Sequence, residues 1–305
     1  MIPPHLASVR VAANAMATRF EIILIEGDPA RLRAAAEEAL EEIHRIESLL
    51  SLYRPQSDIG RINASAGLDP IRVCSETFNL LLRARKISVQ TDCAFDPTAG
   101  PLIRAWGFTT GQGIRPCPET LARAKKLCGW SQVEMDGPTY RVGLRSLGAS
   151  IDLGAIGKGY ALDRAVALLQ ELGISNALLH GGTSSLLGIG SGPTGTGWKV
   201  ALPIPDTEVS SDTTFDLINT SLSISATWGK YFQDGDSRAG HVLDPRTGNP
   251  IRGTQFSTVV GSEATLTDAL STALLVMGDS SLPSLRTHFP SYRTLTVGSS
   301  LAANP

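Results

Sequence analysis

Apolar side chains recur at helical spacing in several stretches of the chain. The clearest stretch has apolar residues three and four positions apart, at Leu32, Ala36, Leu40, Ile43, Ile46 and Leu50. This spacing gives a helix one buried face. The same criterion predicts helices over residues 32–50, 78–87, 121–127, 158–172 and 267–277, and Gly173 is expected to end the fourth.

Short apolar or alternating runs between glycines, prolines and polar turns predict strands. They cover residues 19–25, 140–144, 177–179, 185–189, 198–202, 222–224 and 257–260. The glycine-rich stretch 190–197 is expected to form the tip of a β-hairpin. Helices predominate early and strands late, so we expect a single mixed α+β unit.

Composition and charge narrow the class of protein. Of 305 residues, 42% are hydrophobic and 18% are charged, which suits a globular chain with a sizeable core and not a disordered one. The net charge of −2 gives no basic surplus, so nucleic acid is not an expected partner. No apolar run reaches the ~18–20 residues of a membrane span. We expect a soluble, folded protein without an integral membrane segment.

The chain start and the cysteines give little further direction. The first residues lack a charged region followed by an apolar one, so the expected location is cytoplasmic. A processed, exported chain in the periplasm is the alternative. Cys74, Cys93, Cys117 and Cys128 form no CxxC pair and match no zinc pattern. We expect reduced thiols that are mostly buried or incidental.

Two segments combine turn residues with polar side chains. In residues 94–101, Asp96-Pro97 favours a turn, and Thr98 lies where the backbone could approach a ligand closely, although a plain loop is the simpler interpretation. In residues 151–163, three glycines before a helix leave N–H groups free to face an anion, and Lys158 adds a positive charge. The spacing matches neither a P-loop nor a dinucleotide fingerprint, so a tight turn is the alternative.

Two further segments carry candidate catalytic or metal-binding groups. His241 precedes the turn sequence Asp244-Pro245 and is a candidate general base, although a lone histidine is more often structural. Asp268 and Thr272 are four residues apart on the last predicted helix, so their oxygens share one face. A carboxylate and a hydroxyl suit Mg²⁺. The alternative is a helix cap formed by Thr267, with Asp268 favoured by the helix dipole.

Taken together and in this order, these segments resemble the ApbE family of flavin transferases, which move FMN from FAD onto a threonine or serine of a target protein. The matching pieces are Met-Ala-Thr-Arg-Phe at 16–20, Leu-Ser-Leu-Tyr-Arg-Pro-Gln-Ser-Asp-Ile at 50–59, Asn63, Phe-Asp-Pro-Thr at 95–98, the glycine-lysine segment 152–163, Gly181-Gly182, the segment 241–248 and Asp-Ala-Leu-Ser-Thr-Ala at 268–273. The resemblance covers residues 14–280, which leaves residues 1–13 as an expected N-terminal tail and 281–305 as a C-terminal extension.

The resemblance implies an α+β domain of the T-fold-like ApbE type that binds FAD with Mg²⁺ on the pyrophosphate. The implied metal ligands are Asp268 and Thr272, joined by a backbone carbonyl near Ala155 or Gly157. Tyr53 would lie against the isoalloxazine ring. The other implied flavin-binding residues are Met16 and Thr18 on the adenine side, together with Asp58, Phe95, Asp96, Thr98, Lys158, Asp163 and His241.

The implied reaction is a transfer of a phosphorus-containing group. A base, at the position of His241, takes the proton of an acceptor threonine or serine hydroxyl, which attacks the FMN-side phosphorus and displaces AMP. Asp268 would act mainly by holding the metal. With water as the acceptor, the same residues would make an FAD pyrophosphatase. A third possibility is a flavin carrier that binds FAD without turnover.

The chain departs from the family pattern at three places. Gly181-Gly182-Thr183 stands where the family has Gly-Gly-Asp. Residues 224–228 read Ile-Ser-Ala-Thr-Trp in place of Thr-Ser-Gly-Asp-Tyr, and residues 16–18 read Met-Ala-Thr in place of Met-Gly-Thr. None of these positions is an implied metal ligand or His241, so they bear on acceptor choice and flavin affinity.

Overall fold

The structure is a computed structural model that describes residues 6–110, 113–202, 214–227, 231–234, 237–240, 242–251 and 254–298. The chain divides into two compact units, each containing helices and strands. Unit 1 comprises Met1–Glu47, Ile156–Ile224 and Val259–Asp268, and unit 2 comprises Ser48–Ala155, Ser225–Thr258 and Ala269–Pro305. Four continuous elements run from one unit into the other: α1 (Pro29–Leu50), β10 (Thr220–Ala226), β15 (Thr254–Gly261) and α7 (Ala264–Met277).

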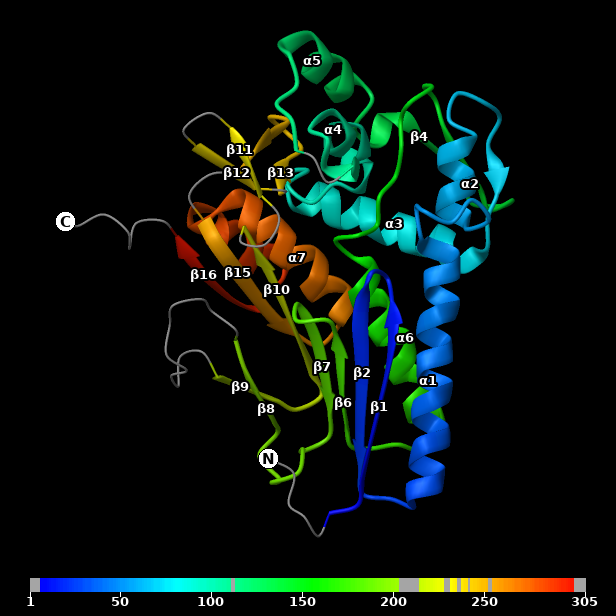
Figure 1. The fold of residues 1–305 in the computed structure, drawn as a ribbon, viewed down its shortest axis with the longest axis vertical. Helices are drawn as coiled ribbons and strands as arrows, with labels where there is room; N and C mark the ends of the chain where they lie inside the picture. Colours follow the sequence, from blue (N-terminus) through cyan, green and yellow to red (C-terminus); the bar gives the residue numbers. More distant parts are fainter. Residues whose placement is uncertain are drawn as a thin grey trace, which may run out of the picture. The chain divides into compact units, whose positions relative to one another are not determined.

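Unit 1 is built on antiparallel strands. β1 (Ser8–Ala15), β2 (Thr18–Ile25), β6 (Ala177–Gly181), β7 (Ser185–Ile189) and β10 are hydrogen-bonded in that order. The large sheet has seven strands in the order β1-β2-β6-β7-β10-β15-β16, where β16 is Arg293–Gly298. Two helices accompany these strands: α1 (Pro29–Leu50) runs along the β1–β2 hairpin, and α6 (Gly157–Glu171) contacts β6 and β7 (Figure 1).

The buried faces follow the hydrophobic pattern. The α1 side chains that recur at three- and four-residue steps are all buried, with Ala36, Ile43 and Ile46 fully enclosed. Each large aliphatic side chain removed from water contributes about 1.5–3 kcal/mol, which makes this stripe the main attachment of α1. The prediction of a helix over residues 32–50 is confirmed.

Unit 2 carries shorter elements. They are α2 (Asp58–Ala64), β3 (Ile71–Arg72), α3 (Ser75–Gln90), α4 (Gly100–Ala105), α5 (Pro118–Lys126), β4 (Val133–Asp136), β5 (Arg141–Leu144), β11 (Tyr231–Asp234), β12 (Ser237–Gly240), β13 (Leu243–Asp244), β14 (Asn249–Pro250) and α8 (Leu282–His288). A small sheet has the order β3-β5-β4. Trp106, in an apolar cluster with Leu102 and Leu243, donates its indole N–H to the Gly248 carbonyl at 2.8 Å.

Most predicted elements are confirmed, with two corrections. Residues 190–197 are not a hairpin tip, because they connect β7 to β8 (Trp198–Ala201), which pairs instead with β9 (Thr214–Leu217). Trp198 and Leu217 pack over Gly188 of β7, where a Cβ would lie 2.9 Å from Leu217 Cβ. The structure also places β1 inside the expected tail 1–13, and α8 and β16 inside the expected extension 281–305.

In the described part of the chain, every helix falls short of the length and apolar character that a membrane crossing requires. All four cysteines are free thiols. Cys93 and Cys117 are exposed and the other two are half-buried, so of the two expectations, buried or incidental thiols, the structure does not support burial.

The turn between β1 and β2 holds two non-glycine residues in the left-handed conformation. Met16 has φ 50° and Ala17 has φ 59°. A two-residue hairpin turn requires positive φ at both central positions and favours Asn-Gly there. The Met16 N–H donates to Glu47 Oε1 at 2.8 Å, which ties the turn to α1. The alanine at position 17 is therefore a strained residue held by its surroundings.

Replacing Ala17 with glycine should stabilise the protein. A left-handed backbone conformation destabilises an L-residue by about 1–2 kcal/mol. Glycine avoids this strain, but its greater conformational freedom in the unfolded chain offsets roughly 0.5–1 kcal/mol of the gain. We expect Ala17→Gly to raise the free energy of unfolding by about 0.5–1 kcal/mol in urea denaturation. Ala12→Gly, at an exposed position inside β1, is the control and should lower it. Equal losses in both variants would contradict the strain at Ala17.

Candidate functional site

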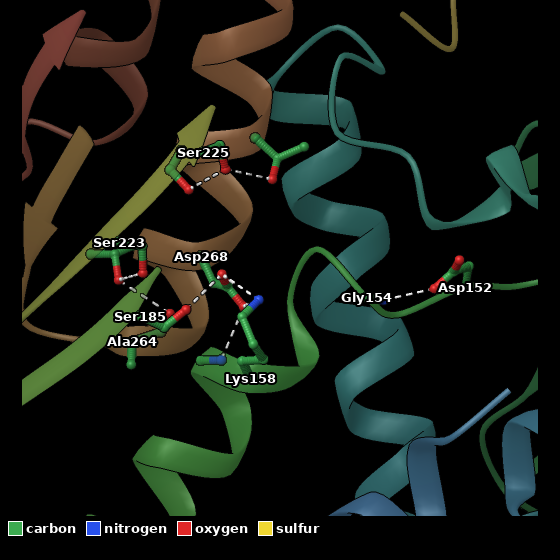
Figure 2. A network of polar contacts seen from close by, with 12 residues as sticks. Asp152, Gly154, Lys158, Ser185, Ser223, Ser225, Ala264 and Asp268 are labelled. Atoms are coloured by element: carbon green, nitrogen blue, oxygen red, sulfur yellow. Dashed lines mark hydrogen bonds and ion pairs between the residues drawn. The ribbon is translucent and has the colours of Figure 1, made fainter. Parts of the chain in front are cut away.

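The carboxylate of Asp268 is buried on α7 and surrounded by hydrogen-bond donors. Asp268 is only 3% exposed. Its Oδ2 accepts from the Gly159 N–H at 3.0 Å, and its Oδ1 accepts from Ser185 Oγ at 3.1 Å (Figure 2). Lys158 Nζ lies 3.4 and 3.5 Å from the two oxygens. A buried carboxylate needs such partners, and this one draws them from the start of α6 and from β7.

Glycine at position 159 allows α6 to approach α7. A Cβ on Gly159 would lie 2.0 Å from the Ala264 carbonyl oxygen and 2.9 Å from Asp268 Cβ. Any larger residue would therefore push the two helices apart. The glycines of residues 151–163 thus serve, at least here, to bring a backbone N–H to Asp268.

Asp163, which the resemblance implies as a flavin-binding residue, has hydrogen-bond partners within the protein. Its Oδ1 accepts from the Ala264 N–H and its Oδ2 from the Thr265 N–H, both at 2.8 Å. The carboxylate therefore caps the first turn of α7 from the neighbouring helix. Since α7 begins at Ala264, Thr267 and Asp268 lie within the helix, and the alternative in which Thr267 caps it is wrong.

Serines on β10 contact hydroxyl groups of α7. In unit 1, Ser221 Oγ and Ser223 Oγ lie 3.1 and 3.0 Å from Thr267 Oγ1. In unit 2, Ser225 Oγ lies 2.9 Å from Ser271 Oγ and 3.1 Å from Thr272 Oγ1. Thr272, a predicted metal ligand, is thus hydrogen-bonded to a serine that the sequence analysis did not select.

In unit 2, Asp96 and Thr98 form the compact turn expected of residues 94–101. Thr98 donates to Asp96 Oδ1 through its N–H at 2.9 Å and its hydroxyl at 2.7 Å. The Gly129 N–H donates to Thr98 Oγ1 at 2.5 Å. Burial raises the pKa of Asp96, against the opposing effect of the Thr98 hydrogen bonds. The side chain of Phe95 is only 2% exposed, so its ring packs in the core.

Asp152 is a second carboxylate near this turn in unit 2. Its N–H donates to the Pro97 carbonyl at 2.7 Å, and its Oδ1 accepts from the Gly154 N–H at 2.8 Å (Figure 2). Burial raises its pKa above the ordinary value. The sequence analysis did not select it as a site residue, although a carboxylate directly before a glycine-rich turn was a visible signal.

Tyr53 and Asp58 lie on one short loop but differ in exposure. Tyr53 is 74% exposed, as expected for a ring that packs on a ligand. The loop is fixed by Ser57, which donates to the Ser51 carbonyl at 2.5 Å and accepts from the Gly60 N–H at 2.8 Å. Asp58 is 6% exposed and binds Arg61 and the Cys74 N–H, so its carboxylate joins α2 to α3.

Three of the remaining predicted residues, Thr18, Ala155 and Gly157, lie at or just before the start of a strand or helix. Thr18 follows the β1–β2 turn, where a Cβ on Gly182 would lie 2.4 Å from its Oγ1. Ala155 is half-buried, and Gly157 is the first residue of α6. His241, the candidate base, lies outside the described residues.

The side-chain oxygens of Asp268 and Thr272 on α7 are of the type that binds a hard cation. Asp268 and Thr272 supply a carboxylate and a hydroxyl one helical turn apart, and both are oxygen ligands of the kind that Mg²⁺ takes. Among the residues that the structure describes, no three His, Cys, Asp or Glu side chains gather as a metal cluster. Mg²⁺ needs no such cluster, because it keeps waters and substrate phosphates. Lys158 shows that the Asp268 carboxylate already attracts a positive charge.

The raised pKa of Asp96 predicts a pH-dependent stability difference. The folded state binds the proton of the Asp96 carboxyl more tightly than the unfolded chain does. The free energy of unfolding therefore falls as the pH rises above the pKa of Asp96 in the unfolded chain, and it stops falling once the pH exceeds the raised pKa in the folded state. Asp96→Asn removes the titration. We expect its free energy of unfolding, relative to wild type, to rise from about pH 4 upward and then level off.

Urea denaturation at a series of pH values measures this difference. Asp69→Asn, at an exposed aspartate of the same unit, is the matched control. A constant offset between Asp96→Asn and wild type across the series would show that burial of Asp96 has no energetic effect.

Comparison with known proteins supplies the family. The ApbE family model matches residues 16–293, which extends past the domain end expected at residue 280. A relative from Escherichia coli K12, called FAD:protein FMN transferase, is 30% identical over 281 residues, covering 90% of this chain and 80% of its own length.

Two solved structures agree with this match. The ApbE protein of Thermotoga maritima has a TM-score of 0.85 and 31% identity, covering 96% of this chain and 94% of its own. The apo flavinyl transferase ApbE of Pseudomonas stutzeri has a TM-score of 0.83 and 26% identity, covering 97% and 95%. The predicted mixed α+β fold of the ApbE type is thereby confirmed, and the chain belongs to the ApbE family.

Proposed function

We propose that this chain is an FAD:protein FMN transferase, which moves FMN from FAD to a threonine or serine hydroxyl of an acceptor protein and releases AMP. The observation that carries the proposal is the Asp268 carboxylate, held by Gly159, Ser185 and Lys158. Its surroundings include the glycine-lysine segment, one of the two segments most specific to the family. The activity named for the similar Escherichia coli protein supports the same conclusion.

The reaction is a displacement at phosphorus. The acceptor oxygen bonds to the FMN-side phosphorus, and the bond from that phosphorus to the bridging oxygen breaks, so that AMP leaves with the bridging oxygen. The acceptor proton passes to a base, a role that we assign to His241 from its place in the family pattern.

The cation in this proposal is Mg²⁺, held by Asp268 and Thr272 with a backbone carbonyl of Ala155 or Gly157. When bound, it would neutralise the pyrophosphate and the charge that develops on AMP. Lys158 would contribute a second positive charge beside the same carboxylate, on the nucleotide side. The chain's own task is to keep the Asp268 carboxylate oriented, through its hydrogen bonds with Gly159 and Ser185.

The flavin would be bound by groups that the structure leaves accessible. Tyr53 offers an exposed aromatic face on a loop fixed by Ser57, which lowers the cost of ordering it on the isoalloxazine ring. The Asp96–Thr98 turn would act mainly by fixing the backbone, because Thr98 is 1% exposed and its hydroxyl is already bonded to Asp96. Phe95, Asp58 and Asp163 would act by supporting the backbone, because their side chains are buried or already bonded within the protein.

Replacing Asp268 should abolish the transfer. Asp268→Ala removes the carboxylate that we assign to Mg²⁺, and we expect FMN labelling of an acceptor domain to fall at least 100-fold. In-gel flavin fluorescence measures the labelling. Asp216→Ala is the control, because Asp216 forms an exposed ion pair with Lys199 at 2.9 Å, and it should keep full activity. Full labelling by Asp268→Ala would refute the assignment of the metal to Asp268.

Removing the metal and the acceptor in turn separates the three candidate activities. For a transferase, AMP measured by chromatography should match acceptor labelling, stop with EDTA and return with excess Mg²⁺. AMP formed at the same rate without acceptor would indicate FAD hydrolysis. FAD retained on the protein without AMP would indicate a carrier.

A further inference from the structure

The strand β10 presents serines at alternate positions toward one helix. Ser221, Ser223 and Ser225 share one face of the strand, because strand side chains alternate with period two. Each has its hydroxyl within 3.1 Å of a hydroxyl on α7. A strand and a helix that meet inside a protein usually pack apolar side chains against each other. The row of hydroxyl contacts between β10 and α7 is therefore unusual.

Ser225 differs from the other two in its partners. Ser221 and Ser223 are fully buried and contact Thr267, which is also fully buried. Ser225 is half-buried and contacts Ser271 Oγ at 2.9 Å and the half-buried Thr272 Oγ1 at 3.1 Å (Figure 2). It is therefore the β10 serine that reaches the hydroxyl assigned to the metal.

A hydroxyl that ligates a cation must turn its proton away from the cation. It carries one hydrogen and two lone pairs, and the lone pair must face the metal. At 3.1 Å, Ser225 Oγ can accept a hydrogen bond from the Thr272 hydroxyl, and the Ser225 hydroxyl can donate its own hydrogen bond to Ser271 Oγ at 2.9 Å. This direction of donation leaves the Thr272 oxygen available as a ligand.

We propose that Ser225 is a positioning residue that fixes the orientation of the Thr272 hydroxyl for a divalent cation. The proposal rests on the proposed function for the role of Thr272 as a ligand. Ser225 lies in one of the segments where the chain departs from the family pattern, next to Ala226, and it keeps the hydroxyl that this role needs. Its effect is on metal affinity, through an outer hydrogen bond that holds a ligand in place.

A purely structural role for Ser225 predicts a loss of stability without a loss of metal affinity. A neutral hydrogen bond between a strand and a helix contributes about 1 kcal/mol to stability and nothing to metal binding. The Ser223–Thr267 contact at 3.0 Å is the same chemical bond between the same two elements. Ser223→Ala is therefore the matched control for Ser225→Ala.

Mn²⁺ is the probe for the cation, with free Mn²⁺ measured by electron paramagnetic resonance on the full chain, with and without FAD. We expect Ser225→Ala to raise the Mn²⁺ dissociation constant 10–100-fold. Ser223→Ala should stay within about 3-fold of wild type, and so should Ser225→Thr, which keeps the hydroxyl. Thermal unfolding of all variants confirms that each is folded, and similar losses in Ser223→Ala and Ser225→Ala are expected.

Three results would overturn the proposal: a Ser225→Ala variant that binds Mn²⁺ as wild type does, equal weakening by Ser223→Ala, or no Mn²⁺ binding by wild type with or without FAD. Failure of the proposed function looks different. Wild type that binds Mn²⁺ with the expected dependence on Ser225 but transfers no FMN would keep the positioning role and refute the transferase.

Discussion

Burial of the Asp268 carboxylate is the constraint on which the candidate site depends. An ionised carboxylate out of water is costly unless donors surround it, and removing one partner of such a group typically costs several kcal/mol. Here the donors come from the first turn of α6 and from β7, so the helix start and the strand must both be in place. The close approach at Gly159 and the cap from Asp163 set the position of α7 against α6. The glycine-lysine segment therefore forms part of the enclosure around the Asp268 carboxylate.

Sequence patterns predicted the elements whose burial is one-sided and missed those defined by distant partners. The stripe of α1 was visible because six apolar residues recur within one helix. Strand β1 was missed because its inward-facing residues are few, and its order comes from a continuous ladder with β2. Asp163 shows the same limit at the site, since its hydrogen-bond partners, Ala264 and Thr265, lie about a hundred residues further along the chain, where no local pattern points to them. Asp268 and Thr272 were found because four-residue spacing on a helix is a local signal.

The hydroxyl groups of α7 give this helix a kind of attachment that apolar packing lacks. Apolar contacts depend on area and tolerate small rotations, whereas a hydroxyl bond depends on where one proton points. Thr267 fixes the helix at Ser221 and Ser223, and Ser225 continues the contact toward Thr272. Rotation of α7 about its axis is therefore resisted on the face next to Asp268 and Thr272, the proposed metal-binding positions. A site that must hold a small, geometrically demanding cation benefits from that restraint.

Three departures from the family pattern, Ala17, Thr183 and Ala226, lie in turns or at a strand end, away from the groups that donate hydrogen bonds to Asp268. Ile224, in the same segment as Ala226, lies inside β10. Ala17 is in the β1–β2 turn and Thr183 in the turn between β6 and β7, where Gly182 approaches Thr18. Ala226 ends β10, three residues past Ser223, which pairs with Ser185. Inside the strands the register is fixed, because a shift of one residue would turn Ser185 away from Asp268. Turn residues carry no such constraint. The register of β7 and β10 therefore keeps Ser185 on the buried carboxylate, and residues 17, 183 and 226 can differ without removing a donor from it.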